Sequence, residues 1–215
     1  MSRNRFFTAD HHFGHANILK HESEKRRNKH GSKFLSIDQM DDYLVDQWNA
    51  TVKADDLVYY LGDFSMKLQS TLDILPFLNG EKILIAGNHD SFFKQLVDTD
   101  PQKHRKAREC ALQVGFSEVH LRHEIDLPSV GLVLLSHFPY SPPENERADL
   151  SANDLRYLEH RPTRGKEKLL LHGHVHSEWI VHQYKNMPPM LNVGVDMWRM
   201  RPVSETEIIE KFRRL

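Results

Sequence analysis

Short apolar runs alternate with amphipathic segments along the chain. Runs of about four to eight apolar residues bounded by turn residues are typical of buried strands. They predict strands at Arg5–Ala9, Leu57–Leu61, Lys82–Ala86, Val130–Ser136 and Lys168–Leu171, with further strands at Trp179–His182 and Met190–Val195.

Between the early predicted strands, apolar residues recur with the spacing of an α-helix. Two capping-box patterns, Ser36 with Gln39 and Ser204 with Glu207, predict the starts of helices. The apolar faces of these two helices would be formed by Met40, Leu44, Val45 and Trp48, and by Ile208, Ile209 and Phe212. Further helices are expected at Leu72–Leu78 and Asp100–Val114. Strands that alternate with helices, followed by a strand-rich second half, predict an α/β (mixed α+β) fold with helices packed outside the sheets.

The composition is that of an ordinary globular protein, and it narrows the chemistry. The chain has 215 residues, 39% apolar and 27% charged, so a single domain over residues 1–215 is expected. Its 29 basic and 30 acidic residues give a net charge of −1, which removes any whole-chain argument for binding nucleic acid or a membrane. The single cysteine, Cys110, excludes an internal disulfide and a thiolate zinc cluster. The sequence has neither a signal-peptide core nor an apolar stretch of membrane length, so the cytoplasm is the expected location.

Metal-competent side chains follow the predicted strands directly: Asp10 and His12, Asp63, Asn88 and His89, His137, and His174 and His176. Loops just past strand ends are rigidly placed yet accessible, which suits a ligand site. Imidazole, carboxylate and amide ligands suit Mn²⁺, Fe²⁺ and Zn²⁺. One ion takes roughly three or four protein ligands, so the set is too large for one ion and fits two that share a carboxylate. Each motif alone also fits a turn or surface polarity, but packing does not explain the repetition at strand ends.

The ordered motifs resemble those of a known family. Asp10-x-His12, Gly62-Asp63, Gly87-Asn88-His89-Asp90, His137 and Gly173-His174-Val175-His176 are similar to the five motifs of the calcineurin-like metallophosphoesterases. The opening Asp10-His11-His12-Phe13-Gly14-His15 and the ending Asn192-Val193-Gly194-Val195-Asp196 resemble a subgroup of small, stand-alone phosphoesterases from microbes and phages. The resemblance implies a four-layer sandwich, in which two facing mixed β-sheets are flanked by helices.

The resemblance also implies a role for each motif residue. Asp10, His12 and His176 would bind one divalent metal, Asn88, His137 and His174 would bind the second, and Asp63 would bridge both. The implied reaction is hydrolysis of a phosphate ester by in-line attack of a metal-bridging hydroxide, with His89 as general acid. Asn88, His89 and His15 are the predicted phosphate contacts. Asp90 is expected to shape its turn, His11 to be structural or to support a residue of the site, and His172 to pack in its strand.

Two features bear on the substrate. The phosphoprotein phosphatases of this superfamily carry a phosphate-clamping arginine after the Gly-Asp motif, whereas Gly62-Asp63 is followed here by Phe64-Ser65-Met66-Lys67. This departure favours a phosphodiesterase over a protein phosphatase. The stretch Lys20–Lys33 contains Lys25, Arg26, Arg27, Lys29, His30 and Lys33 and is a candidate basic lip over the site. A solvated polar segment is the favoured alternative for this stretch.

The expected substrate is a nucleotide or another small phosphodiester. A phosphomonoesterase is the near alternative. A nuclease acting on single-stranded nucleic acid is less favoured, because the composition is not basic and no aromatic-rich groove is evident. A non-catalytic binding module is disfavoured because the chain retains every predicted ligand and His89. Two divalent ions per chain are expected, Mn²⁺ before Fe, Zn or Ni, since affinity alone does not select the native ion. Oligomeric state and pathway stay open.

Overall fold

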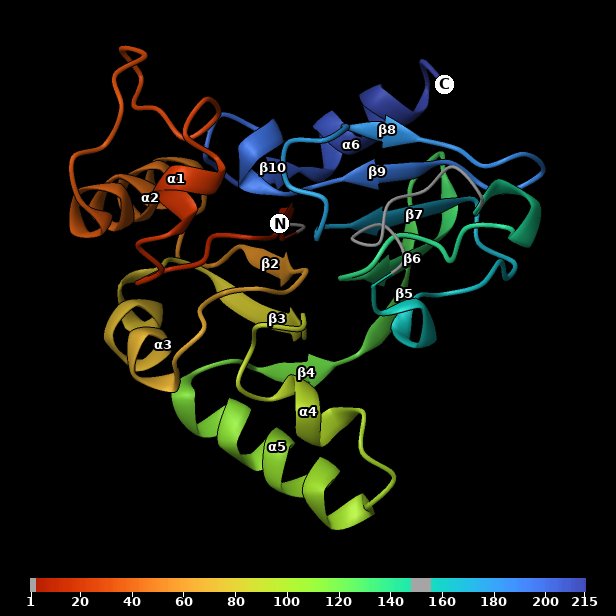
Figure 1. The fold of residues 1–215 in the computed structure, drawn as a ribbon, viewed down its shortest axis with the longest axis horizontal. Helices are drawn as coiled ribbons and strands as arrows, with labels where there is room; N and C mark the ends of the chain where they lie inside the picture. Colours follow the sequence, from red (N-terminus) through yellow and green to blue (C-terminus); the bar gives the residue numbers. More distant parts are fainter. Residues whose placement is uncertain (1–2, 148–155) are drawn as a thin grey trace.

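The computed structural model describes residues 3–147 and 156–215, and these form two mixed five-stranded sheets (Figure 1). The first sheet has the order β10-β1-β2-β3-β4, with strands Val203–Ser204, Arg5–Thr8, Leu57–Tyr60, Glu81–Ile85 and Glu118–His120. The second has the order β5-β6-β7-β9-β8, with strands Arg122–Leu127, Gly131–Ser136, Leu169–His172, Met190–Asn192 and Val181–His182. The predicted α/β sandwich is confirmed. The single domain predicted for residues 1–215 includes residues 1–2 and 148–155, which lie outside the described residues.

The middle strands of both sheets are parallel, and the edge strands supply the antiparallel pairs. β1 to β4 run parallel, with β10 antiparallel at the edge. β6, β7 and β9 also run parallel, between antiparallel β5 and β8. Parallel strands covered on both faces read as continuous apolar runs, which is why the sequence revealed β1, β2, β3 and β7 so clearly.

A layer of buried apolar side chains lies between the two sheets. Phe7, Leu61 and Ile85 from the first sheet pack with Val133 and Leu171 from the second, and all five are buried. Phe7 and Tyr59 are aligned neighbours on β1 and β2, and their rings stack at 5.5 Å. This shared core fixes the two sheets face to face.

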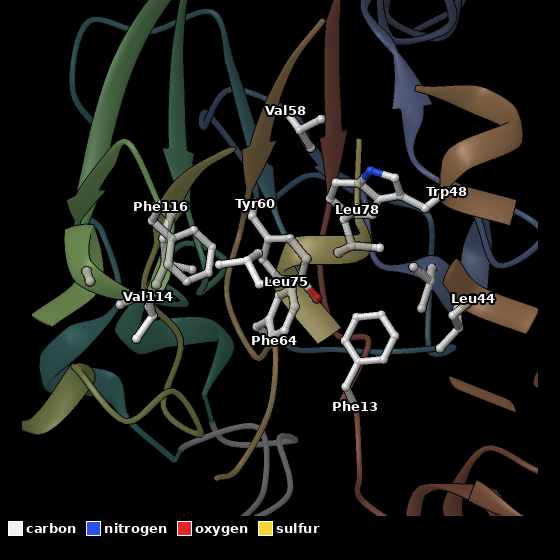
Figure 2. Packing of buried hydrophobic residues seen from close by; sticks show 14 of the residues in the cluster. Phe13, Leu44, Trp48, Val58, Tyr60, Phe64, Leu75, Leu78, Val114 and Phe116 are labelled. Carbon is white, nitrogen blue, oxygen red and sulfur yellow. The ribbon is translucent and has the colours of Figure 1, made fainter. Parts of the chain in front are cut away.

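Helices cover the outer face of the first sheet. They include α2 (Ile37–Thr51), α3 (Leu68–Ile74) and α5 (Pro101–Val114), with the short α1 (Ile18–His21) and α4 (Phe93–Leu96). Figure 2 shows the cluster beneath them, where Trp48 of α2 stacks on Tyr60 of β2 at 6.1 Å. Ser36 caps α2 as predicted, since its hydroxyl accepts the Gln39 N–H at 3.2 Å.

The outer face of the second sheet is covered mainly by connecting segments. Leu134, Leu170 and Met190 point to this side and pack with Tyr140 and Tyr184. The C-terminal helix α6 (Glu205–Phe212) follows β10 directly and buries Ile208 in the core between the sheets. Its capping box of Ser204 and Glu207 forms as predicted.

The helix expected at Leu72–Leu78 is displaced. It starts earlier, as α3, and ends at Ile74, where a 3-10 helix takes over at Leu75–Phe77. Pro76 lies in the first turn of that 3-10 helix. Proline has no N–H and cannot continue the α-helical hydrogen bonding, so the α-helix ends before it.

All the strands that precede the polar motifs point the same way within their sheets, so their carboxyl ends gather at one edge of the sandwich. The two sheets are joined there, because Ala9 forms a parallel bridge with Gly194 and accepts the Val195 N–H at 3.1 Å. The fold therefore brings loops that are far apart in sequence to a single place. In the part of the chain that the structure describes, no helix is both long and apolar enough to span a bilayer.

Candidate metal centre

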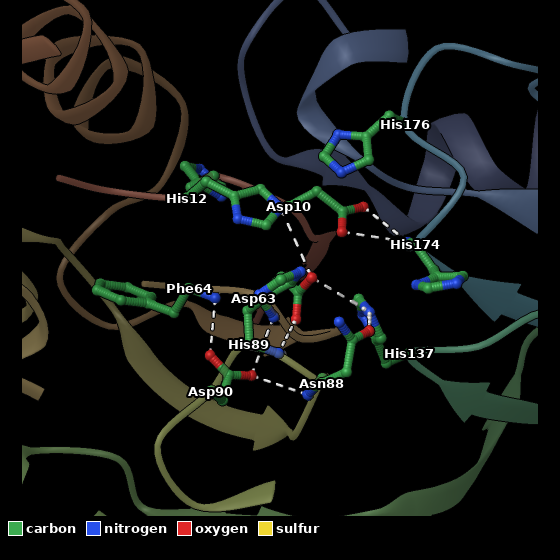
Figure 3. Close-up of polar contacts among 12 residues, drawn as sticks. Asp10, His12, Asp63, Phe64, Asn88, His89, Asp90, His137, His174 and His176 are labelled. Atoms are coloured by element: carbon green, nitrogen blue, oxygen red, sulfur yellow. Dashed lines mark hydrogen bonds and ion pairs between the residues drawn. The ribbon is translucent and has the colours of Figure 1, made fainter. Parts of the chain in front are cut away.

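The loops that follow β1, β2, β3, β6 and β7 converge at the joined edge of the sandwich (Figure 3). Several of their polar residues have left-handed backbones: Asp10 (φ 60°), His12 (54°), Asp63 (60°), His174 (72°) and His176 (47°). Such conformations are uncommon outside glycine and tend to persist at functional sites, where the surrounding structure holds them. Five of the ten described non-glycine residues with positive φ are therefore residues that the sequence singled out.

Two groups of side chains are close enough to hold a cation each. Asp10, His12 and His176 offer one ligand atom apiece within 4.8 Å of one another, and so do Asp10, Asp63 and His137. The first group is the trio that the family resemblance assigns to one metal. Asp10 belongs to both groups, so the two positions are adjacent.

One oxygen of Asp63 lies between these groups. Its Oδ2 is 3.6 Å from His12 Nε2 and 3.5 Å from His137 Nε2. Its Oδ1 accepts the backbone N–H of His89 at 2.9 Å. That second contact fixes the rotation of the carboxylate and leaves Oδ2 facing both histidines, the position expected of a bridging ligand.

Asn88 and His174 complete the set on the His137 side. Asn88 Oδ1 lies 3.2 Å from His137 Nε2, and the His174 ring centroid lies 5.2 Å from that of His137. The backbone N–H of His174 is within hydrogen-bonding distance of both Asp10 carboxylate oxygens, at 3.1 and 3.0 Å. The structure therefore brings together all seven predicted ligands, although their roles as ligands stay predictions.

Two glycines leave room for the carboxylates. A Cβ on Gly87 would lie 2.3 Å from Asp63 Oδ1, and one on Gly173 would lie 2.5 Å from Asp10 Oδ2. Real Cβ atoms do not approach this closely, so any side chain here would displace a carboxylate. The two positions require glycine because the backbone passes so near the site.

The electrostatics of the group fit a divalent cation. Burial raises the pKa of Asp10 to about 6 and that of Asp63 to about 7, since both carboxylates are removed from water. Burial also lowers the pKa of His12, His137 and His174. Neither of the buried ring nitrogens of His12 has a hydrogen-bond partner among the described residues. A bound cation would compensate the buried carboxylates and give the neutral imidazoles a partner.

Asp90 shapes the turn of its motif, as expected. Its Oδ2 accepts the backbone N–H groups of Gly87 at 2.8 Å and Asp63 at 2.9 Å, and its Oδ1 accepts that of Phe64 at 2.8 Å. These contacts tie the loop after β3 to the loop after β2 and so position Asn88 relative to Asp63.

His11 and His172 are structural, as expected. His11 is fully buried, and its Nδ1 lies 2.6 Å from the Tyr60 hydroxyl. His172 is likewise buried at the end of β7, and its Nδ1 contacts the Gly173 carbonyl at 2.7 Å.

His89 and His15 line a cavity of about 400 Å³ over the predicted ligands. The His89 ring centroid lies 5.3 Å from that of His12, and the His15 ring centroid lies 5.9 Å from it. Burial, followed by the charges of neighbouring histidines, lowers the pKa of His89 to about 4. The ring is therefore uncharged at neutral pH, and an approaching phosphate would favour its protonated form. Among the described residues, no carboxylate hydrogen-bonds to this ring.

Arginine and tyrosine side chains line the same cavity. Arg156, Tyr157 and Arg161 come from the segment before β7, and Arg156 lies over the Tyr157 ring at 5.2 Å. Met66 and Ile18 add apolar surface. Arg161 is buried at the wall of the cavity.

The basic lip predicted for Lys20–Lys33 needs correction at Arg26. This side chain is buried and reaches under the site, where its Nε donates to Asp196 Oδ1 at 2.8 Å. Arg27 is not free to form a lip either, because it pairs with Glu24 at 2.8 Å. The burial of Arg26 could not be predicted from this polar segment, because a buried arginine and a solvated one look the same in the sequence.

Asp196 is a site residue to which the sequence reasoning gave no role, although it ends one of the motifs that carry the family resemblance. Its Oδ2 lies 2.9 Å from His176 Nδ1, and its pKa is lowered to about 2 because Arg26 and His176 outweigh the effect of burial. The same contact, together with Asp10, outweighs burial at His176 and raises the pKa of that ring to about 9. The rule that found the other residues, a carboxylate just past a buried strand, also applies to Asp196 after β9.

Comparisons with known proteins give relatives along nearly the whole chain. The chain is 31% identical over 222 residues to the Gene 66 protein of Mycobacterium phage L5, covering 96% of this chain and 93% of that protein. It is 33% identical over 199 residues to the Gene 66 protein of Mycobacterium phage D29, covering 91% and 89%. The uncharacterized protein MJ1445 of Methanocaldococcus jannaschii is 36% identical over 93 residues, covering 42% and 48%. No model of a known protein family matches the chain.

A solved structure shares the fold. The protein of unknown function AQ665 from Aquifex aeolicus superposes with a TM-score of 0.60 at 23% identity, covering 97% of this chain and 99% of that one. The phosphopantetheinyl hydrolase PptH from Mycobacterium tuberculosis superposes with a TM-score of 0.42 at 14% identity, covering 94% of each chain.

Proposed function

We propose a hydrolytic function for this chain, which belongs to the family of the Gene 66 proteins of Mycobacterium phages L5 and D29. It is a calcineurin-like metallophosphoesterase that holds two divalent ions and hydrolyses a small phosphodiester. The observation that carries the proposal is Asp63 Oδ2, placed 3.6 Å from His12 Nε2 and 3.5 Å from His137 Nε2. A buried carboxylate oxygen between imidazoles of two adjacent groups is the arrangement that a pair of cations needs.

The proposed ligand sets are those that the family resemblance implies, and the first of them is also one of the two groups in the structure. Asp10, His12 and His176 hold one ion, and Asn88, His137 and His174 hold the other, with Asp63 shared. Divalent cations, when bound, supply Lewis-acid polarisation of phosphoryl oxygens and activation of water at neutral pH. The buried carboxylates of Asp10 and Asp63 offset the positive charge of the ions. Mn²⁺ is the favoured ion, and the nitrogen and oxygen ligands also suit Fe, Zn and Ni.

The remaining polar residues of the cavity bind and orient the substrate. His89 presents a ring N–H to the phosphate or the leaving oxygen, and protonation of its ring as the anion approaches makes it the general acid. The His89 backbone N–H donates to Asp63 Oδ1 at 2.9 Å, so the position of His89 depends on that of the bridging carboxylate. His15 and the amide of Asn88 are the other proposed phosphate contacts.

The cavity supports a small substrate. Its volume of about 400 Å³ lies near the lower end of the range for small-molecule sites, about 300–1,000 Å³. Tyr157 and Met66 provide surface for the organic part of a nucleotide-like diester. A nuclease would need a groove that tracks a strand, and the one basic stretch proposed for that task is partly buried at Arg26.

One observation favours a phosphomonoesterase as the second candidate. Arg156 and Arg161 line the cavity beside His89 and His174. Guanidinium groups pair well with the dianion of a terminal phosphate. These residues could therefore supply, from another segment, the clamp that the Gly-Asp motif lacks.

The test compares p-nitrophenyl phosphate with bis-p-nitrophenyl phosphate, with Mn²⁺ present. We expect faster turnover of the diester, and a reversed ranking would select the phosphomonoesterase. Asp63→Asn removes the bridging charge and should abolish both activity and uptake of Mn²⁺. Asp126→Asn is the matched control, because Asp126 is exposed on β5, and it should behave like the wild type. Full activity in Asp63→Asn would contradict the proposal for either ester.

A further inference from the structure

We propose that Arg26 and Asp196 form a positioning pair that sets the affinity of the metal position formed by Asp10, His12 and His176. The inference rests on the proposed function and concerns one of its two metal positions. It begins from Arg26, an arginine that is 1% exposed and lies beneath the loop after β1.

The contacts of Arg26 account for all five N–H donors of a guanidinium group. Nε and Nη2 donate to the two oxygens of Asp196, at 2.8 and 3.2 Å. Nη1 donates to the carbonyl of His11 at 2.7 Å and to Met40 Sδ at 3.7 Å, and Nη2 also donates to the carbonyl of Asp10. A single side chain thus holds the backbone of the Asp10–His12 loop and the carboxylate after β9.

Each member of the metal group is adjacent to this pair. The Asp10 carbonyl is a direct acceptor, and the His11 carbonyl belongs to the peptide group that leads into His12. Asp196 Oδ2 faces His176 Nδ1 at 2.9 Å. A carboxylate can only accept at this contact, so Nδ1 carries a proton, and Nε2 is the nitrogen that would bind a metal once its own proton is released.

The loop that Arg26 holds is one that would not keep its shape unaided. Asp10 and His12 both have left-handed backbones, at φ 60° and 54°. Non-glycine residues persist in this region only where their surroundings impose it. The two carbonyl contacts of Arg26 lie within this strained segment and fix the direction in which Asp10 and His12 leave the backbone.

The residues proposed to bind only the second ion, and the shared Asp63, are held by contacts other than the pair. Among the described residues, Arg26 and Asp196 make no hydrogen bond to Asp63, Asn88, His137 or His174. His137 is held instead by the Leu61 carbonyl, 2.8 Å from its Nδ1. A loss of the pair should therefore weaken one metal position and spare the other, which a purely structural role does not predict.

The test measures Mn²⁺ binding to purified protein by isothermal titration calorimetry, after removal of metals with a chelator. Wild type should bind two ions. Arg26→Lys keeps the charge but has only three donors on a single nitrogen, and Asp196→Asn keeps an acceptor oxygen but loses the charge. Each variant should weaken one ion by about 10- to 100-fold, the usual effect of removing a partner of a metal ligand, and leave the other ion unchanged. Arg201→Lys is the matched control, because Arg201 makes a similar bidentate pair with Glu207, at 2.6 and 3.2 Å, on α6.

Circular dichroism establishes that each variant is folded. If the single variants unfold, Arg26→Met combined with Asp196→Leu fills the buried space with apolar groups, a change that buried ion pairs often tolerate. This double variant should fold and still bind one ion weakly. Two ions bound with wild-type affinity in any folded variant would overturn the inference. Equal weakening of both ions would also overturn it. A wild type that binds no metal would instead overturn the proposed function, together with the inference that rests on it.

Discussion

A carboxylate that is excluded from water needs a compensating cation or several hydrogen-bond donors. Asp90 is stabilised by hydrogen-bond donors, since three backbone N–H groups donate to its two oxygens. Asp63 has one such donor, and its other oxygen faces two imidazoles. These two aspartates lie in neighbouring loops and differ in what surrounds them. The difference separates the aspartate that holds a turn from the one suited to a cation.

A substitution at His89 should change the rate of hydrolysis without changing metal binding. In His89→Ala the predicted ligands are intact, so Mn²⁺ binding should match the wild type. Turnover should fall by about 10²- to 10⁴-fold, the usual contribution of a general acid. The loss should be largest for esters with poor leaving groups, which need the proton most. Steady-state kinetics with a series of substituted phenyl esters measures this, and an equal loss for all leaving groups would assign His89 to phosphate binding alone.

Single site residues were predictable where a side chain able to bind a metal directly follows an apolar strand. A histidine or aspartate just past an apolar strand has a defined position, and the structure brings the seven predicted ligands together. Arg26 was not predictable in this way. Its burial depends on Asp196, which is 170 positions away and pairs with it only in the folded chain.

At the scale of elements, most of the parallel strands and the capped helices were visible in the sequence. β4, β5 and β10 were not predicted. β5 alternates exposed and buried residues and carries Arg122, Glu124 and Asp126, so it lacks a continuous apolar run. β10 has two residues and forms because β1 offers an open edge. Such strands depend on their neighbours more than on their own composition.

The capping box of α6 should make stability depend on pH in acid. The hydrogen bond from Arg201, opposed by partial burial, lowers the pKa of Glu207 from 4.5 to about 2. A carboxyl whose pKa is lower in the folded state stabilises fully above its unfolded pKa, and this contribution is lost as the pH falls toward 2. Glu207→Gln should therefore be less stable than the wild type at pH 7, and the difference should shrink between about pH 5 and pH 2.

Urea denaturation across this pH range measures the effect. Glu210→Gln is the matched control, because Glu210 is exposed on the same helix and forms no ion pair among the described residues. It should track the wild type at every pH. A Glu207→Gln difference that stays constant from pH 7 to pH 2 would contradict the account of the cap.

At the scale of the whole molecule, the site exists because two sheets meet at one edge. Ligands from the first sheet (Asp10, His12, Asp63 and Asn88) face those from the second (His137, His174 and His176) across the bridge between Ala9 and Gly194. Neither sheet alone carries a complete set. Periodicity could predict the strands, but the pairing of the two sheets required the family resemblance, because contacts between sheets leave no local pattern in the sequence.

The central claim is that two ions per chain are needed to hydrolyse a phosphate ester, and a metal titration tests it most directly. Protein freed of metal by a chelator receives Mn²⁺ in steps while hydrolysis of bis-p-nitrophenyl phosphate and of p-nitrophenyl phosphate is followed. We predict no activity at the start and a rise that saturates at two equivalents per chain. Activity that survives chelation, or that saturates at one equivalent, would contradict a dinuclear centre.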